Sequence, residues 1–382
     1  MQQKKHILVF IDWFLPAYKA GGQIPSVLNI IKLLSNEIDF SVITSNSDEG
    51  DAPFENLSFN KWTTNFGIRI IYISPENQNY SFLNHLIDNE IFDAAYFNSF
   101  FSFKFTTLPL YIVKRNRPCS KIILAPRGML GKEALAIKPL KKQTFIWLAR
   151  FFNFYKNIHW HASSELESNE IKAIFGKKTA NIKTAIDISI LPRIENIEKE
   201  KEVNSLKIFY LSRITDKKNL LGSIEILQKI TSGTIQFDII GPVGNEEYWN
   251  ECKKALEKLP KNIKTSYLGS IPNYQLPEIL KSYHTFLFPT LNENYGHVIA
   301  ESLAAACPVI VSERTPWQDL EQYNAGWVVS LENQQLFVEK IKIMLTLNKI
   351  EYNRMANSAL SYIHQKVTQS SIIQDNKAIF LE

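Results

Sequence analysis

Short apolar runs alternate with longer amphipathic segments along nearly the whole chain. The apolar runs have the length of buried strands, and the segments between them have the period of helices. This alternation is typical of βαβ units, so the predicted fold class is α/β with doubly wound, Rossmann-like sheets. Strands are expected at His6–Ile11, Phe40–Thr44, Ile68–Ile73, Ala94–Phe97, Lys121–Ala125, Ile158–His161, Leu206–Leu211, Gln236–Ile240, Ile263–Leu268, Thr285–Phe288, Val309–Val311 and Trp327–Val329.

Helices are expected between these runs. Ser164 and Glu167 have the spacing of a capping box, which marks the start of one helix. The predicted helices include Pro25–Leu34, Pro139–Tyr155, Leu166–Phe175, Asn219–Ile230, Glu246–Leu259, Gln275–Ser282 and His297–Ala306.

A charged, weakly hydrophobic stretch divides the chain. A chain of 382 residues is too long for one typical core and suits two domains. The stretch Pro192–Ser205 reads PRIENIEKEKEVNS and has the composition of a linker. We therefore expect one Rossmann-like domain at 1–192, a second at 193–365, and a C-terminal helix at 366–382 that packs back on the first domain. Two such sheets facing each other would form a cleft at the carboxyl ends of their strands.

The composition excludes several classes of protein. Apolar residues make up 45% of the chain and charged residues 21%, which is globular, and a net charge of +5 is too small to indicate nucleic-acid binding. Cys119, Cys252 and Cys307 lack the spacing of a zinc site or a disulfide framework. Asp12 interrupts the first apolar run too early for a signal peptide, and no apolar stretch approaches the ~20 residues of a membrane span. The expected location is the cytoplasm.

Two carboxylates in the segment Phe288–Glu313 are candidates for sugar binding. Glu293 follows a predicted strand, a helix is expected to begin around Gly296, and Glu301 lies on its second turn. Carboxylates accept hydrogen bonds from sugar or ribose hydroxyls, and the free amides of a helix start bind phosphate. In the alternative interpretation, Glu293 only favours the helix start and Glu301 is solvated. The apolar sequence around Glu301 favours burial, where an unpaired carboxylate is costly.

Two cations follow the strand at Leu206–Leu211. Arg213 and Lys218 lie in the connection before the next helix. An arginine binds phosphate oxygens bidentately and a lysine acts as a point charge, so the pair suits a diphosphate. The alternative is an ordinary pair of surface charges.

Together these two segments resemble glycosyltransferase family 4, the group 1 enzymes with the GT-B fold. Glu293 and Glu301 match the family's E-x7-E motif, and Tyr295, Gly296 and His297 lie between them. The resemblance implies that Glu301 holds the ribose, that Glu293 contacts the transferred sugar, and that the residues between them belong to the donor site.

The arginine–lysine loop extends the resemblance. Arg213 and Lys218 match it, and Asn219 stands where glycine is more usual. The resemblance implies that both cations neutralise the donor diphosphate. The chain contains no Asp-x-Asp pair, so fixed cations instead of a carboxylate-held metal are expected to stabilise the leaving group. No cofactor is expected beyond the UDP- or GDP-sugar co-substrate.

Glycines mark two further candidate positions. Gly21 and Gly22 resemble the family's glycine-rich loop and would let the backbone approach the donor phosphates or the acceptor. Gly241 follows a predicted strand and would admit the nucleotide base. In each case the alternative is an ordinary turn glycine.

The first half departs from the family at two places. Arg127 stands where many members carry a histidine, and it would hold the donor phosphate or an acidic acceptor, or form a structural salt bridge. Asn181–Asp187 retains only Asp187 of the usual Asn-Gly-x-Asp pattern, so no direct ligand role is expected there. His159 and His161 are interpreted as structural.

Aromatic and basic residues gather in Ile137–Trp160. Such a segment suits peripheral attachment to an anionic membrane, at the inner face of the cell membrane, where lipid-linked acceptors reside. It equally suits a helix that packs its aromatic face on the first sheet.

The resemblance implies a retaining transferase that moves a hexose from UDP- or GDP-sugar to a glycan or lipid-linked acceptor, in bacterial surface polysaccharide biosynthesis. A sugar-nucleotide epimerase or hydrolase on the same fold is the alternative, and a non-enzymatic sugar-binding protein is a third hypothesis.

Overall fold

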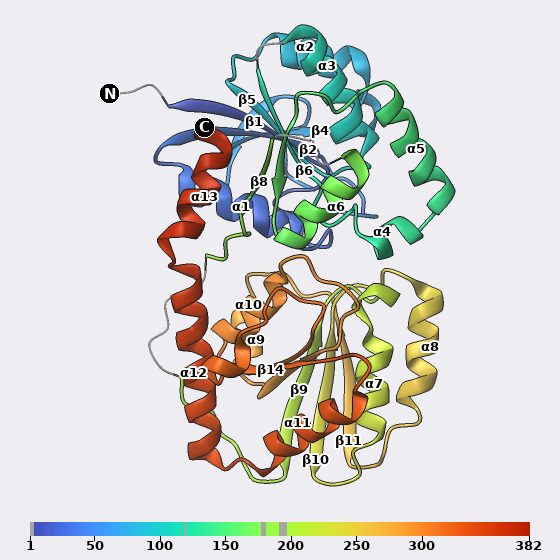
Figure 1. Cartoon of the computed structure of the whole chain (residues 1–382), viewed down its shortest axis with the longest axis vertical. Coiled ribbons are helices and arrows are strands. Elements are labelled where there is room, and N and C mark those ends of the chain that lie inside the picture. The colour runs from blue at the N-terminus through green and yellow to red at the C-terminus, as the bar shows by residue number, and fades with distance from the viewer. Residues whose placement is uncertain (1–3, 118–119, 177–180, 191–196) are drawn as a thin grey trace. The chain divides into compact units, whose positions relative to one another are not determined.

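The computed structural model describes residues 4–117, 120–176, 181–190 and 197–382. The chain forms two compact units (Figure 1): Met1–Ile188 together with Ser370–Glu382, and Ser189–Gln369. Part of the predicted linker, up to residue 196, and Cys119 lie outside the described residues.

The first unit contains an eight-stranded sheet. All neighbouring strands are parallel except β3 and β4, which are antiparallel. In spatial order the strands are β3 (Trp62–Asn65), β4 (Ile68–Ile73), β2 (Ile38–Ser45), β1 (Lys5–Ile11), β5 (Ala94–Asn98), β6 (Lys121–Ala125), β7 (His159–Ala162) and β8 (Ile182–Thr184).

Helices cover both faces of this sheet. Along β1, Ile7 and Val9 belong to one core cluster and Leu8 and Phe10 to the other, because successive side chains of a strand point to opposite faces. The first cluster includes residues of α1 (Gln23–Leu34) and α13 (Ser370–Leu381). The second includes residues of α2 (Tyr80–Asp88), α3 (Leu108–Asn116), α5 (Pro139–Phe151) and α6 (Glu165–Phe175). Shorter elements are η1 (Pro75–Asn77), the π-helix η2 (Phe103–Thr107) and α4 (Lys132–Ala136).

The second unit contains a six-stranded parallel sheet. Its spatial order is β11 (Ile263–Gly269), β10 (Thr234–Ile240), β9 (Ser205–Leu211), β12 (Thr285–Phe288), β13 (Val309–Ser312) and β14 (Gly326–Val329). Its helices are α7 (Leu220–Gln228), α8 (Glu246–Leu256), α9 (Leu276–Leu280), α10 (His297–Ala304), α11 (Gln334–Thr346) and α12 (Lys349–Val367), with 3-10 turns η3 (Asp216–Lys218) and η4 (Leu320–Tyr323). The α/β class predicted from the alternating pattern is confirmed.

Three local differences from the predicted elements have physical causes. The helix expected at Pro139–Tyr155 ends at Phe151, where Phe152 caps it, and Asn153 adopts a left-handed conformation that no helix continues. The segment Ile182–Thr184, for which no strand was predicted, forms edge strand β8 on β7. The domain limit expected at residue 365 lies inside α12, which continues to Val367.

Candidate functional site

The strand order of the second unit creates a topological switch point between β9 and β12. From β9 the chain adds β10 and β11 on one side, and then crosses to add β12, β13 and β14 on the other. Doubly wound sheets bind ligands at the carboxyl ends of the two strands beside such a point. Arg213 and Lys218 follow β9, and Glu293 follows β12. The predicted cations and the first predicted carboxylate therefore flank the switch point of one sheet.

Direct contacts join the two loops. The Lys218 ammonium forms an ion pair with the Glu293 carboxylate. Asn219 Nδ2 donates a hydrogen bond to the Pro289 carbonyl over 2.7 Å. Both side chains of the ion pair are partly exposed, at 22% and 13%, so a ligand can reach them. The ion pair could not be foreseen from the sequence, because its members are far apart along the chain.

The asparagine that replaces the usual glycine has a clear structural role. Asn219 adopts the left-handed conformation, with φ of +55° and ψ of +47°. Asparagine is among the few residues other than glycine that enter this region readily. Its side chain accepts a hydrogen bond from the Gly222 amide and so caps α7. Asn219 thus adopts a backbone conformation that a glycine would also allow, and it adds a cap that glycine lacks.

Gly241 and Gly244 allow close packing around Arg213. Gly241 has φ of +136°, and a Cβ atom there would lie 2.0 Å from the Ser212 carbonyl oxygen. A Cβ on Gly244 would lie 2.7 Å from Arg213 Cδ. Gly241 is thus required by a close approach of the backbone at the end of β10, and its contact with a nucleotide base stays a prediction.

Glu301 carries the most perturbed carboxyl group of the predicted donor site. It lies on the second turn of α10, and burial raises the pKa of its carboxyl to about 7. Within the described part of the chain, its side chain has no hydrogen-bond or ion-pair partner. A carboxyl that is desolvated and unpartnered is suited to accept hydrogen bonds from a hydroxyl ligand, because such bonds replace lost hydration.

Residues between the two glutamates pack into the second unit. Gly296 has φ of +83° and precedes α10, and a Cβ there would lie 3.0 Å from Glu293 Cγ. The Tyr295 hydroxyl lies 3.1 Å from Ser189 Oγ, and His297 Nδ1 lies 3.4 Å from the same oxygen. Both rings are buried. They hold the backbone of the motif in place, and their contact with a donor stays a prediction.

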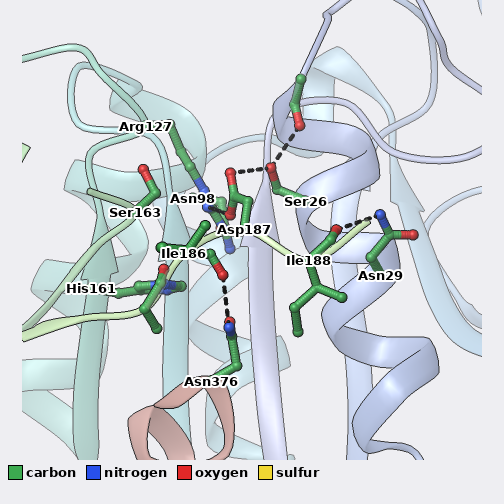
Figure 2. Close-up of polar contacts among 12 residues, drawn as sticks. Ser26, Asn29, Asn98, Arg127, His161, Ser163, Ile186, Asp187, Ile188 and Asn376 are labelled. Atoms are coloured by element: carbon green, nitrogen blue, oxygen red, sulfur yellow. Dashed lines mark hydrogen bonds and ion pairs between the residues drawn. The ribbon is translucent and has the colours of Figure 1, made fainter. Parts of the chain in front are cut away.

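Arg127 lies in the first unit, at the carboxyl end of β6, and its guanidinium group is bound inside the protein (Figure 2). Nη1 donates to Asp187 Oδ1 over 2.6 Å, and Nη2 donates to Asn98 Oδ1 and to the Tyr96 hydroxyl. Burial by itself would lower the pKa of Arg127, but the charge of Asp187 raises it overall. This geometry is the structural salt bridge of the alternative interpretation, and a role in ligand binding stays a prediction.

The ion pair is part of a network that holds the end of the first unit. Asp187 Oδ2 accepts a hydrogen bond from Ser26 on α1, over 2.8 Å. Asn29 donates to the Ile188 carbonyl and Asn376 donates to the Ile186 carbonyl, as Figure 2 shows. The segment in which no ligand role was expected therefore connects α1, α13 and Arg127.

His161 belongs to the interior beside this network. Its Nδ1 lies 2.8 Å from the Tyr96 hydroxyl and its Nε2 lies 3.1 Å from the Ala185 carbonyl. Burial, with the nearby Arg127 charge, lowers the pKa of His161 to about 4. The ring is thus neutral at physiological pH and has a structural place, as the sequence indicated. His159 is partly buried, and burial lowers its pKa as well.

The glycine-rich segment precedes α1. Gly21 has φ of +80° and a Cβ there would meet no atom within 4 Å, so open space surrounds it. Gly22 has an ordinary right-handed conformation, and its carbonyl accepts hydrogen bonds from the amide and hydroxyl of Ser26. Only Gly21 therefore needs a glycine on conformational grounds, and binding by either residue stays a prediction.

Asp12 is a candidate that the sequence interpretation missed. It follows β1 at the switch point between β1 and β5, and accepts a hydrogen bond from Ser102 over 2.5 Å. Burial raises the pKa of its carboxyl, although hydrogen bonds from Ser102 and Ser99 oppose the rise. The sequence does contain a signal for this site, because Asp12 comes directly after a predicted buried strand. From the sequence alone, Asp12 is interpreted only as an interruption of the first apolar run.

Comparison with known proteins gives a family match for part of the chain and structural likenesses for nearly all of it. Residues 192–361 match the family "Glycosyl transferases group 1". Anabaena Alr3699/HepE, solved with UDP and glucose, is 14% identical over 98% of each chain, with a TM-score of 0.70. Sucrose-phosphate synthase from Thermosynechococcus elongatus is 13% identical over 99% of this chain and 98% of that one, with a TM-score of 0.72. WaaG, a glycosyltransferase involved in lipopolysaccharide biosynthesis, is 14% identical over 98% of each chain, with a TM-score of 0.63. These likenesses establish the GT-B fold.

Comparison with curated proteins gives no match. In the described ranges, no helix combines the length and the apolar composition that crossing a bilayer requires.

Proposed function

We propose that the chain is a group 1 glycosyltransferase, a retaining enzyme that transfers a hexose from a UDP- or GDP-sugar to a glycan or lipid-linked saccharide. The family match over residues 192–361 supports this proposal. The arrangement of Arg213, Lys218 and Glu293 at one switch point carries this proposal. Retention rests on the resemblance of the E-x7-E segment.

Each of these groups has a place in the proposed transfer. The bond between the anomeric carbon and the diphosphate oxygen breaks, and its electron pair leaves on the nucleoside diphosphate. The acceptor oxygen forms the new bond on the face that the diphosphate leaves, and its hydroxyl proton passes to the departing diphosphate. Arg213 and Lys218 stabilise the charge that develops on the leaving group, because fixed cations need no reorganisation at that moment. Glu293 accepts hydroxyl hydrogen bonds from the hexose, and Glu301 accepts those of the ribose.

Metal independence is part of the proposal. Its support is that Lys218, which pairs with Glu293, and Arg213, which packs against Gly244, both follow β9, so two fixed cations are available there to a diphosphate. Turnover should therefore persist after treatment with EDTA and a passage over a chelating resin. Activity that disappears in EDTA and returns with manganese would contradict this part alone.

The nearest alternative is a sugar-nucleotide hydrolase or epimerase. Asp12 is the observation that favours it, since a buried carboxyl of raised pKa lies at the switch point of the first sheet. Product analysis with and without acceptor separates the two: a transferase forms a new glycoside only with acceptor, and a hydrolase releases free sugar at the same rate in both.

Calorimetric titration with UDP and GDP, followed by a donor screen for released nucleoside diphosphate, tests the proposed function. We expect one of the two nucleotides to bind, and Arg213→Ala to weaken that binding. Absence of binding by both would refute a nucleotide-sugar enzyme.

The proposed biological setting is the synthesis of bacterial surface polysaccharide at the membrane. WaaG, which shares the fold, is involved in lipopolysaccharide biosynthesis, and that relation is the support for this setting. Extension of a lipid-linked saccharide by the enzyme, and no extension of the free saccharide, would support the setting.

A further inference from the structure

Helix α5 exposes an apolar stripe, which the polar residues Gln143 and Thr144 interrupt between Leu140 and Trp147. Leu140, Trp147 and Phe151 are 80%, 62% and 66% exposed, and their spacing places them on one face of the helix. Leu148 borders the stripe, and Phe152, which caps the helix, is 70% exposed. Trp147 stacks on Phe151 with ring centroids 5.6 Å apart. We call these five residues the α5 face.

The α5 face is distinct from the side of the helix that packs on the sheet. Ala149 is buried in the second core cluster of the first unit, and Phe145 and Ile146 pack against that cluster. Figure 1 shows α5 on the side of this unit opposite α13. The helix thus satisfies its own packing with one side and leaves its largest aromatic residues in solvent. Of the two interpretations from the sequence, packing therefore applies only to part of the aromatic set.

The segment that carries the α5 face has charges of a single sign. Residues 134–164 contain no Asp or Glu, and their five cations equal the net charge of +5 of the whole chain. These cations are Lys138, Lys141, Lys142, Arg150 and Lys156. By the helical period, Lys141 and Arg150 border the apolar stripe on opposite sides, and both are exposed.

We propose that the α5 face binds to the surface of an anionic bilayer. Trp and Phe side chains favour the interface between lipid headgroups and acyl chains, and flanking cations are attracted to anionic headgroups. A helix with this distribution lies in the plane of the interface, with its apolar side inserted. The charge argues against a second copy of the chain, because two such faces would bring together the bordering cations Lys141 and Arg150 of both copies. Membrane binding itself does not depend on the proposed function. Its consequence does rest on that function: the enzyme and its lipid-linked acceptor meet at one surface.

Flotation of the full-length protein with vesicles tests this surface without donor or acceptor. We expect binding to vesicles of phosphatidylcholine mixed with phosphatidylglycerol, and little binding to phosphatidylcholine alone. Lys141→Gln/Arg150→Gln should weaken binding by about fivefold for each charge removed, and added salt should reduce the difference from wild type. Trp147→Ser/Phe151→Ser should weaken binding to both vesicle types at any salt concentration.

Ile91→Ser/Ile350→Ser is the matched control, because both isoleucines are exposed and lie outside the α5 face. It should float like wild type. Equal binding of wild type to both vesicle types, or unchanged flotation of Trp147→Ser/Phe151→Ser, would overturn the proposal. A concentration-dependent dimer in light scattering that only the aromatic variant abolishes would assign the face to a second copy and would overturn it as well. Donor turnover measured without vesicles reports on the proposed function separately.

Discussion

The Arg127 guanidinium and the Asp187 carboxylate form an ion pair of 2.6 Å, with side chains only 6% and 4% exposed. Arg127 also donates to Asn98 and Tyr96, so each nitrogen of its guanidinium group has an acceptor. Asp187 lies beside Ile188, the last residue of the first of the two segments that form this unit. The pair therefore joins the end of that segment to the carboxyl edge of the sheet.

Breaking this pair from one side should strongly destabilise the first unit. Arg127→Met leaves a buried, uncompensated carboxylate, which typically costs roughly 3–5 kcal/mol. Lys19→Met breaks the exposed pair with Asp51 and should cost at most about 1 kcal/mol. Denaturant unfolding, followed by a signal from the first unit, measures both.

The double variant Arg127→Met/Asp187→Leu should recover part of that stability, because no lone buried charge remains. If Arg127→Met instead keeps wild-type stability and raises the KM for donor or acceptor, the arginine serves a ligand and the structural interpretation is wrong.

The ion pair of Lys218 and Glu293 should affect catalysis more than stability, since both side chains are partly exposed. Lys218→Ala should lower kcat by about 10²- to 10³-fold, the range expected when one preorganised stabilising group is lost. Glu293→Gln should lower kcat while keeping most of the affinity for UDP or GDP, because it leaves the diphosphate contacts intact. Lys229→Ala, an exposed lysine of the same unit that contacts Gln334, is the control.

Steady-state kinetics and calorimetry distinguish these effects. An unchanged kcat in Lys218→Ala would exclude this lysine from the stabilisation of the leaving group, whatever its effect on KM.

Glu301 should make the stability of the second unit depend on pH. Its folded-state pKa of about 7 lies above the ordinary value of 4.5, so the folded state binds more protons in between. Stability should then fall as pH rises from about 4.5 to 7, by at most roughly 3 kcal/mol. Glu301→Gln removes the ionisable group, so this pH dependence should disappear and stability at pH 8 should rise.

Denaturant unfolding between pH 4.5 and 8 measures this effect. The affinity for the donor should instead rise with pH, because the ionised carboxylate accepts hydrogen bonds from a diol. Identical pH profiles for wild type and Glu301→Gln would show that the carboxyl is solvated.

Gly241 and Gly269 offer a matched comparison of two glycines with positive φ. Gly241→Ala places a Cβ 2.0 Å from the Ser212 carbonyl oxygen, so the backbone beside Arg213 must move. At Gly269 the φ angle is +70° and an added Cβ would meet no atom within 4 Å. Gly269→Ala should therefore cost only about 1 kcal/mol of conformational strain. We expect Gly241→Ala to lose more stability and also nucleotide affinity. Equal thermal shifts for the two variants would contradict the close approach.

The sequence by itself predicted much of the architecture. Buried parallel strands are near-continuous apolar runs, so β6 and β12 appeared at the bounds that the structure gives them. Edge elements were harder to recognise, because β3 and β8 are short and carry no buried residue. The left-handed conformation of Asn219 likewise became clear only with its backbone angles.

What the sequence determined about the site was the identity of its chemical groups: carboxylates and cations at the ends of strands, spaced as in the group 1 glycosyltransferases. Only the tertiary structure decided which of them meet. Lys218 pairs with Glu293 because β9 and β12 are neighbours at a switch point, and strand order is not encoded in local periodicity. Arg127 was ambiguous along the chain for the same reason. Its partner Asp187 comes from a distant segment, and only the folded chain brings the two charges together as a buried ion pair.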